Sequence, residues 1–221
     1  ECAATWNTSL GCQALQALAA GGTYNTALGG KAGTALTLGD RNVAIGYNAL
    51  LTEDTGSRSV AIGYNALSSQ NYADYNYNVA VGYAAGTSVA SGLKNTLIGS
   101  LAGDALTNGN YNTAVGYEAL SAEDGHGLNT AIGYQTLNAQ NAGADAYNVA
   151  VGHQAGLLVS TGIYNTIIGG LAGDALTTGT KNVAIGYQAL STEDGHGRNV
   201  AIGYKALEML DAGVDAYNIA I

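Results

Sequence analysis

The sequence predicts an all-β fold, a parallel β-solenoid of about thirteen coils in which equivalent positions recur at spacings of 17–19. Three observations support this prediction. A motif centred on Asn returns at a nearly constant spacing, an alternating apolar pattern follows each Asn, and positions 70 apart in the sequence are nearly identical. A coil of this length buries too little apolar surface to be stable alone, so neighbouring coils must stack and pair their backbones.

One anchor residue, Asn in every coil but one, precedes each predicted strand. From Asn25 onward the spacings between successive anchors are 17, 17, 19 and 17, which sum to 70. Asn78–Gly82 accordingly returns as Asn148–Gly152, and four coils form one super-repeat. The thirteen anchors are Asn7, Asn25, Asn42, Ser59, Asn78, Asn95, Asn112, Asn129, Asn148, Asn165, Asn182, Asn199 and Asn218.

A three-residue strand is predicted directly after each anchor. Its first residue is Val, Thr or Ile, its third is Ile, Leu or Val, and the residue between them is usually Ala. Since strand side chains alternate between two faces, the first and third residues share one face and Ala lies on the other. We expect this Ala to point outward, where it would form a flat stripe suited to a neighbouring chain. Gly46 and its equivalents then end the strand, where the backbone turns.

A second short strand is predicted after the turn, in two versions. In six coils an apolar residue lies eight positions after the anchor, as at Leu50 and Leu120. In five coils that position is Gly, as at Gly33, and the apolar residue moves three positions later, as at Leu36.

Stacking should align equivalent side chains from coil to coil. We expect the anchor Asn residues to form a hydrogen-bonded ladder. We also expect stacked aromatic columns whose role is packing, formed by Tyr47, Tyr64, Tyr117, Tyr134, Tyr187 and Tyr204.

The repeat region fills almost the whole chain. We expect residues 1–6 to form an N-terminal cap or edge segment and residues 7–221 a single solenoid domain with the 70-residue super-repeat. For Cys2 and Cys12, a cap disulfide, interchain bridges and two free thiols all remain open. The last motif stops at Ile221, before its expected Gly. Either the natural chain continues, or another molecule covers this sheet edge and the protein assembles end to end.

The string at residues 129–137, Asn-Thr-Ala-Ile-Gly-Tyr-Gln-Thr-Leu, resembles the shaft repeats of bacteriophage tail fibres. It is also similar to the repeats in the heads of YadA-type trimeric autotransporter adhesins, although those repeats are commonly shorter. The resemblance covers about residues 7–221. It implies a left-handed parallel β-roll packed as a trimer, with aliphatic residues inside each roll and small residues where rolls meet.

Composition and charge exclude several classes of partner. With 47% hydrophobic residues, 33 Gly and no Pro among 221 residues, the chain is neither disordered nor collagen-like. Its formal net charge is -9 with only 7 Lys and Arg, and no apolar stretch approaches the roughly 20 residues that span a bilayer. We therefore expect neither nucleic-acid binding nor membrane insertion.

Acidic loops recur at a sequence interval of 70, at Glu53–Asp54, Glu123–Gly127 and Glu193–Gly197. Carboxylate and carbonyl oxygens suit Ca²⁺, and His beside Asp suits a transition metal. The candidate metal ligands are Asp124, His126, Asp194 and His196. A solvated turn is the competing interpretation, because the first copy has no His and no coil has the ligand density of a dedicated calcium motif. No other cofactor is predicted.

Two non-catalytic functions remain. The three His residues do not supply the nucleophile, base and orienting group of a hydrolytic site, so no enzyme activity is predicted. The first function is a rigid extracellular fibre of the phage tail-fibre or adhesin kind, located outside the cell, on a cell surface or on a virion. The alternative is a binding module that engages a cell surface or glycan through repeated ladders and through the 19-residue coils at 68–77, 138–147 and 208–217.

Overall fold

The computed structural model describes residues 6–19, 21–211, 213–215 and 217–221. Its fold divides into two compact units, which meet in the sequence between Tyr111 and Asn112 and are described in turn. Cys2 and the first five residues of the predicted cap lie outside the described residues, whereas Cys12 is exposed.

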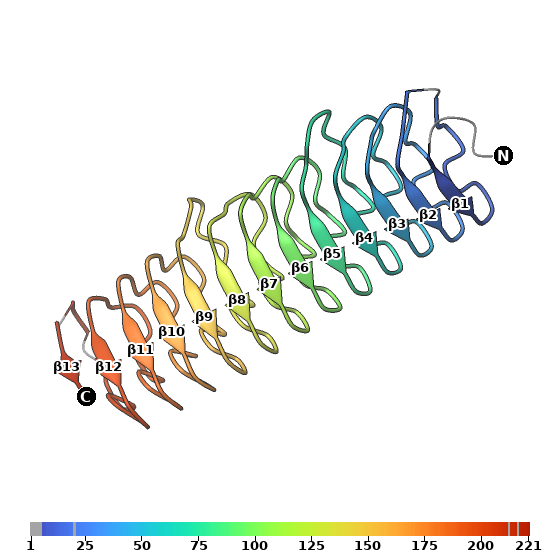
Figure 1. Ribbon diagram of the computed structural model, residues 1–221. Helices are drawn as coiled ribbons and strands as arrows, with labels where there is room; N and C mark the ends of the chain where they lie inside the picture. The colour runs from blue at the N-terminus through green and yellow to red at the C-terminus, as the bar shows by residue number, and fades with distance from the viewer. Residues whose placement is uncertain (1–5, 20, 212, 216) are drawn as a thin grey trace. The chain divides into compact units, whose positions relative to one another are not determined.

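The first unit contains six short strands that pair in chain order, all of them parallel (Figure 1). Equivalent residues of successive coils lie opposite one another, so that Val43 pairs with Val60 and Ala44 with Ala61. The strands are β1 (Thr8–Leu10), β2 (Thr26–Leu28), β3 (Val43–Ile45), β4 (Val60–Ile62), β5 (Val79–Val81) and β6 (Thr96–Ile98).

The second unit repeats this arrangement with seven strands, again parallel and in chain order. They are β7 (Thr113–Val115), β8 (Thr130–Ile132), β9 (Val149–Val151), β10 (Thr166–Ile168), β11 (Val183–Ile185), β12 (Val200–Ile202) and β13 (Ile219–Ala220). Each strand begins at the residue after a predicted anchor, and the described residues contain no helix. The predicted all-β parallel solenoid is therefore confirmed in each unit.

The direction of the strand alternation is opposite to our expectation. The middle residue of the strand points into the coil, where Ala44 is 1% exposed, while Val43 and Ile45 on the other face are only half-buried. The interior is narrow and is filled mainly by leucines that follow the turn, such as the fully buried Leu50 and Leu120. The methyl group of the strand Ala fits opposite these leucines, whereas the β-branched first and third residues of the strand form the outer face.

Leu97 shows how the interior accommodates a larger residue at the Ala position. It is fully buried in β6. A Cβ atom built at Gly86 would lie 2.6 Å from Leu97 Cδ1, and one built at Gly103 would lie 2.7 Å from Leu97 Cδ2. The missing side chains of these two glycines thus provide the volume that Leu97 fills.

The second strand predicted in each coil is a series of tight turns instead. Asn48 and Leu50 have φ values of 56° and 51°, in the left-handed region that extended strands exclude. The segment still pairs with the next coil, because the Leu50 N–H donates to Ala66 O at 3.0 Å. An apolar residue at this position therefore marks a buried turn and not a strand.

The predicted Asn ladder is present in each unit and is interrupted only at Ser59, the one anchor without an amide. Asn42 is 1% exposed, its Oδ1 accepts the N–H of Ser59 at 2.9 Å, and its Nδ2 donates to Gly56 O at 2.9 Å. Asn165 makes the same two bonds, with Asn182 N and Gly179 O, at 2.9 Å each. One side chain thereby joins the next coil to the closing loop of its own coil.

Glycines stack where each strand ends. Gly46 has a φ of 129°, and a Cβ atom there would lie 2.4 Å from Gly63 O. This position accepts only Gly, both for its backbone conformation and for the proximity of the next coil.

We expect Asn165→Ala to lower the free energy of unfolding by about 2–5 kcal/mol, because it leaves a buried N–H and a buried carbonyl group without partners. Urea unfolding followed by circular dichroism measures the change. Replacement of the exposed Asn71 by Ala is the matched control and should change the free energy by less than about 0.5 kcal/mol. Equal effects of the two substitutions would contradict a stabilising role of the ladder.

Because the middle residue of each strand points inward, substitutions of two adjacent residues of β6 should lower the free energy of unfolding by different amounts. Leu97→Ala should destabilise the protein by about 2–5 kcal/mol through the cavity it leaves. Ile98→Ala, at a position 39% exposed, should cost at most about 1 kcal/mol. Thermal and urea unfolding compare the two variants. A larger loss of stability in Ile98→Ala than in Leu97→Ala would contradict the inward orientation of the middle residue.

Candidate metal-binding loops

The four predicted metal ligands lie in two equivalent loops of the second unit, each just ahead of an anchor Asn. Asp124 and Asp194 are exposed, whereas His126 and His196 are half-buried. Each loop brings its Asp and His together with a third residue, Glu123 or Glu193, and one ligand atom of each of the three lies within 4.8 Å of the others.

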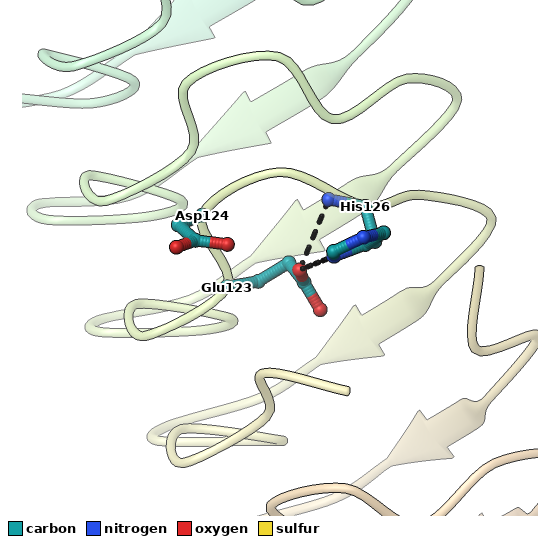
Figure 2. Close-up of side chains that lie close together, drawn as sticks. All are labelled: Glu123, Asp124 and His126. Carbon is teal, nitrogen blue, oxygen red and sulfur yellow. Dashed lines mark hydrogen bonds and ion pairs between the residues drawn. The ribbon is translucent and has the colours of Figure 1, made fainter. Parts of the chain in front are cut away.

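Glu123 is the fully buried member of its loop, with an exposed fraction of 0%. Figure 2 shows its carboxylate facing the ring of His126. Glu123 Oε1 accepts the His126 backbone N–H at 3.1 Å and lies 3.5 Å from His126 Nδ1. Burial raises the pKa of the Glu123 carboxyl above its ordinary value, and the hydrogen bond from the His126 N–H opposes this rise.

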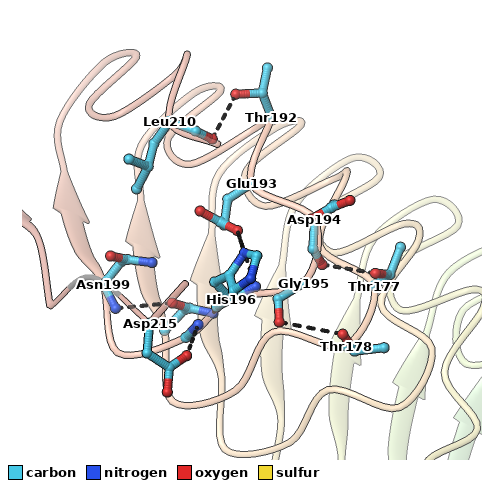
Figure 3. A network of polar contacts seen from close by, with 12 residues as sticks. Thr177, Thr178, Thr192, Glu193, Asp194, Gly195, His196, Asn199, Leu210 and Asp215 are labelled. Carbon is cyan, nitrogen blue, oxygen red and sulfur yellow. Dashed lines mark hydrogen bonds and ion pairs between the residues drawn. The ribbon is translucent and has the colours of Figure 1, made fainter. Parts of the chain in front are cut away.

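The second loop repeats this geometry with a shorter contact between the Glu and His side chains. Glu193 is also fully buried, and its Oε1 lies 3.0 Å from both the backbone N and the Nδ1 atom of His196 (Figure 3). Around this pair, Thr177 Oγ1 donates to Asp194 O at 2.8 Å, and the Gly197 N–H donates to Asp215 Oδ1 at 2.8 Å. These bonds fix the backbone on both sides of the pair.

The first copy of the loop holds the same buried Glu in a different way. Glu53 Oε1 accepts the backbone N–H groups of Asp54 and Gly56, at 3.1 and 2.8 Å. Glu53 Oε2 accepts Gln70 Nε2 and Asn76 Nδ2, both at 2.9 Å. Gly56 stands where the later copies have His. The first loop therefore closes with amide donors and has no imidazole.

Sequence reasoning did not select the buried glutamates as ligands, because acidic residues in polar loops are normally solvated. A usable signal was present in the repeat. Glu53, Glu123 and Glu193 recur at intervals of 70, including the copy that lacks His, so the Glu position is as constant as that of the Asp beside it and more constant than that of the His.

The predicted aromatic columns are confirmed within each unit and lie on the surface. Tyr47 stacks on Tyr64 with ring centroids 5.6 Å apart, and Tyr117 stacks on Tyr134 at 5.5 Å. These rings are about 45% exposed. His153 continues the column of Tyr134 at 5.1 Å and is remote in sequence from the acidic loops.

Amide side chains form a second surface column in the second unit. Gln135 Nε2 donates to Glu118 Oε2 at 2.8 Å, and Gln154 Nε2 donates to Gln135 Oε1 at 3.0 Å. The first of these bonds is the main cause that lowers the pKa of the Glu118 carboxyl. Because each Gln directly follows a ring of the aromatic column in the sequence, polar and aromatic ladders run beside one another.

No pocket is found in the part of the chain that the structure describes, and no helix there is long and apolar enough to cross a membrane. No protein-family model, curated protein or solved structure matches this sequence or fold.

We expect Glu53→Gln to lower the free energy of unfolding by about 2–4 kcal/mol. The neutral amide weakens four hydrogen bonds to the carboxylate and turns an N–H₂ group toward other donors. Urea unfolding measures the loss, and Asp54→Asn, at the exposed neighbour, should stay within about 0.5 kcal/mol of the native protein. A Glu53→Gln protein as stable as the native one would show that these bonds contribute no net stability.

Proposed function

We propose that this protein is a structural subunit of a rigid extracellular fibre, of the kind that forms a shaft on a virion or a cell surface. The observation that carries the proposal is the continuous pairing of successive coils within each unit, in the strands and the turns, which the buried Asn ladder reinforces at every anchor except Ser59. Several backbone bonds join each coil to the next within a unit, so bending at any one coil must break several of them together.

The outer aliphatic face, made of the first and third residues of each strand, supports association with further copies of the chain. Its residues are Val, Thr, Ile and Leu, and no strand carries a charge. Ile98, Ile132 and Ile168 are each 38–39% exposed on it. Parallel sheets are normally covered on both faces, and here only the inner face is covered by the chain itself.

We accordingly place the contact between copies on this outer aliphatic face, and no longer on the Ala stripe, which is buried. A homotrimer is the assembly we propose. End-to-end growth through the edge strands β1 and β13 would extend it.

The alternative function is a binding module for a glycan or cell surface. The observation that favours it is the pair of parallel ladders, aromatic and amide, on the exposed surface of the second unit. Aromatic faces next to amide groups offer stacking and hydrogen bonds to a polar ring.

The proposal predicts a native particle of about 67 kDa, three times the 22.2 kDa of one chain, in sedimentation or light scattering. Electron micrographs should show straight rods of uniform width. The double variant Ile132→Glu/Ile168→Glu should dissociate to single chains, because it buries charge in the contact. Its circular dichroism should match the native protein, since both side chains point outward.

Leu38→Lys is the matched control, because Leu38 is 54% exposed but lies outside the strands. This variant should remain trimeric. A native protein that stays monomeric at high concentration and binds a glycan-coated surface would overturn the fibre and favour the binding module.

A further inference from the structure

The three copies of the acidic loop differ in what faces the buried carboxylate. In the first copy, Glu53 Oε2 accepts two amide donors, Gln70 and Asn76. In the second copy Asn76 is replaced by Ala146, and in the third Gln70 is replaced by Leu210. In these two copies, and only in these, the loop supplies a His. The His ring lies against Oε1 of the Glu, whereas the amide donors of the first copy contact Oε2, so these two loops lose an amide donor on one side of the carboxylate and gain a group that can ligate a metal on the other.

Glu123 gives independent evidence that its carboxylate binds a further group. Its Oε2 atom is buried and has no hydrogen-bond partner, although the side chain is 0% exposed. The Gln140 amide, which is equivalent to the donor Gln70, accepts a bond from Asn148 Nδ2 at 2.7 Å as Gln70 does from Asn78, but its own Nε2 is buried without a partner and makes no bond to Glu123. A buried carboxylate oxygen without a donor is costly, and a bound cation would offset this cost.

The spacing of the ligand atoms fits a small divalent ion. A tetrahedral ion with bonds of about 2.0–2.1 Å holds its ligand atoms about 3.3 Å apart. The distance from Glu Oε1 to His Nδ1 is 3.5 Å in the Glu123 loop and 3.0 Å in the Glu193 loop, on either side of that value. The exposed Asp of each loop lies within 4.8 Å of both atoms and can close on the ion from the solvent side.

We propose that the Glu123–Asp124–His126 loop and the Glu193–Asp194–His196 loop each bind one divalent transition-metal ion of the zinc class. Two carboxylates and one imidazole form a mixed oxygen and nitrogen set, which suits Zn²⁺ and Co²⁺. Ca²⁺ is a poor match, because it takes six to eight oxygen ligands at about 2.3–2.6 Å. Three protein ligands leave one position for water. This site goes beyond the proposed fibre function and does not depend on it.

Titration of the native, metal-free protein with ZnCl₂ in a calorimeter tests the proposal, and metal analysis after dialysis counts the bound ions. We expect two zinc ions per chain. His126→Gln and His196→Gln should each remove one ion, and the double variant should bind none. Titration with Co²⁺ should give the intense visible absorption of a tetrahedral site in the native protein and lose it in the double variant.

His153→Gln is the matched control, because His153 is the only other His of the chain and lies in the aromatic column. It should keep both ions. Glu123→Gln should remove the first ion, and circular dichroism of each metal-free variant checks that its fold is intact. Absence of zinc binding by the native protein would overturn the proposal, as would two ions retained by the double His variant or full occupancy in Glu123→Gln.

Discussion

The anchor Asn side chain is the constraint on which the coil depends. A three-residue strand contributes few backbone bonds, and the buried amide adds two more at the point where the chain enters the strand. Its Oδ1 binds the next coil, and its Nδ2 binds a carbonyl group near the end of its own coil, as from Asn42 to Gly56 and from Asn95 to Gly109. The amide can make both bonds only when the coil has this length.

The 19-residue coils exceed that length, and buried polar groups lose partners as a result. Their anchors are Ser59, Asn129 and Asn199, and the longer loop moves the closing carbonyl group away from the anchor side chain. Nδ2 of Asn129 and of Asn199 is accordingly buried without a partner, whereas Ser59 has no such group to satisfy. In the first of these coils the Ser59 hydroxyl instead receives Gln70 Nε2 at 2.9 Å. The longer loop of this first coil also places two amide donors, Gln70 and Asn76, against the buried Glu53.

Periodicity made the strands, their parallel order and their register predictable, because equivalent residues of a stacked coil must align. The direction of the side chains was not predictable in the same way. Size alone suggests that Val43 and Ile45 are inside and Ala44 outside, and the outcome depends on Leu50 arriving from the opposite wall of the coil. The turn conformation of Leu50 was missed for a related reason, since non-Gly residues seldom take a positive φ and only the stacked neighbours hold it there.

The candidate site was predictable in part. His126 and Asp124 could be selected from residue type and spacing, whereas the role of Glu123 depends on burial, which the sequence of a polar loop does not reveal. The replacement of Asn76 by Ala146 can be read from the sequence, but its meaning as the loss of an amide donor depends on the contact of Asn76 with Glu53 in the folded first copy.

The column of glycines at the strand ends has a consequence for how such a protein changes over time. At this corner each coil touches the next through peptide groups alone, as between Gly46 and Gly63, so no side-chain packing has to change when neighbours change. Duplication or loss of a whole 70-residue super-repeat would therefore keep this corner intact and would also keep residues such as Leu97 between their two glycines. A side chain at Gly46 would clash with Gly63 and require an unfavourable φ, so a change in the number of super-repeats disturbs this corner less than a single substitution within it.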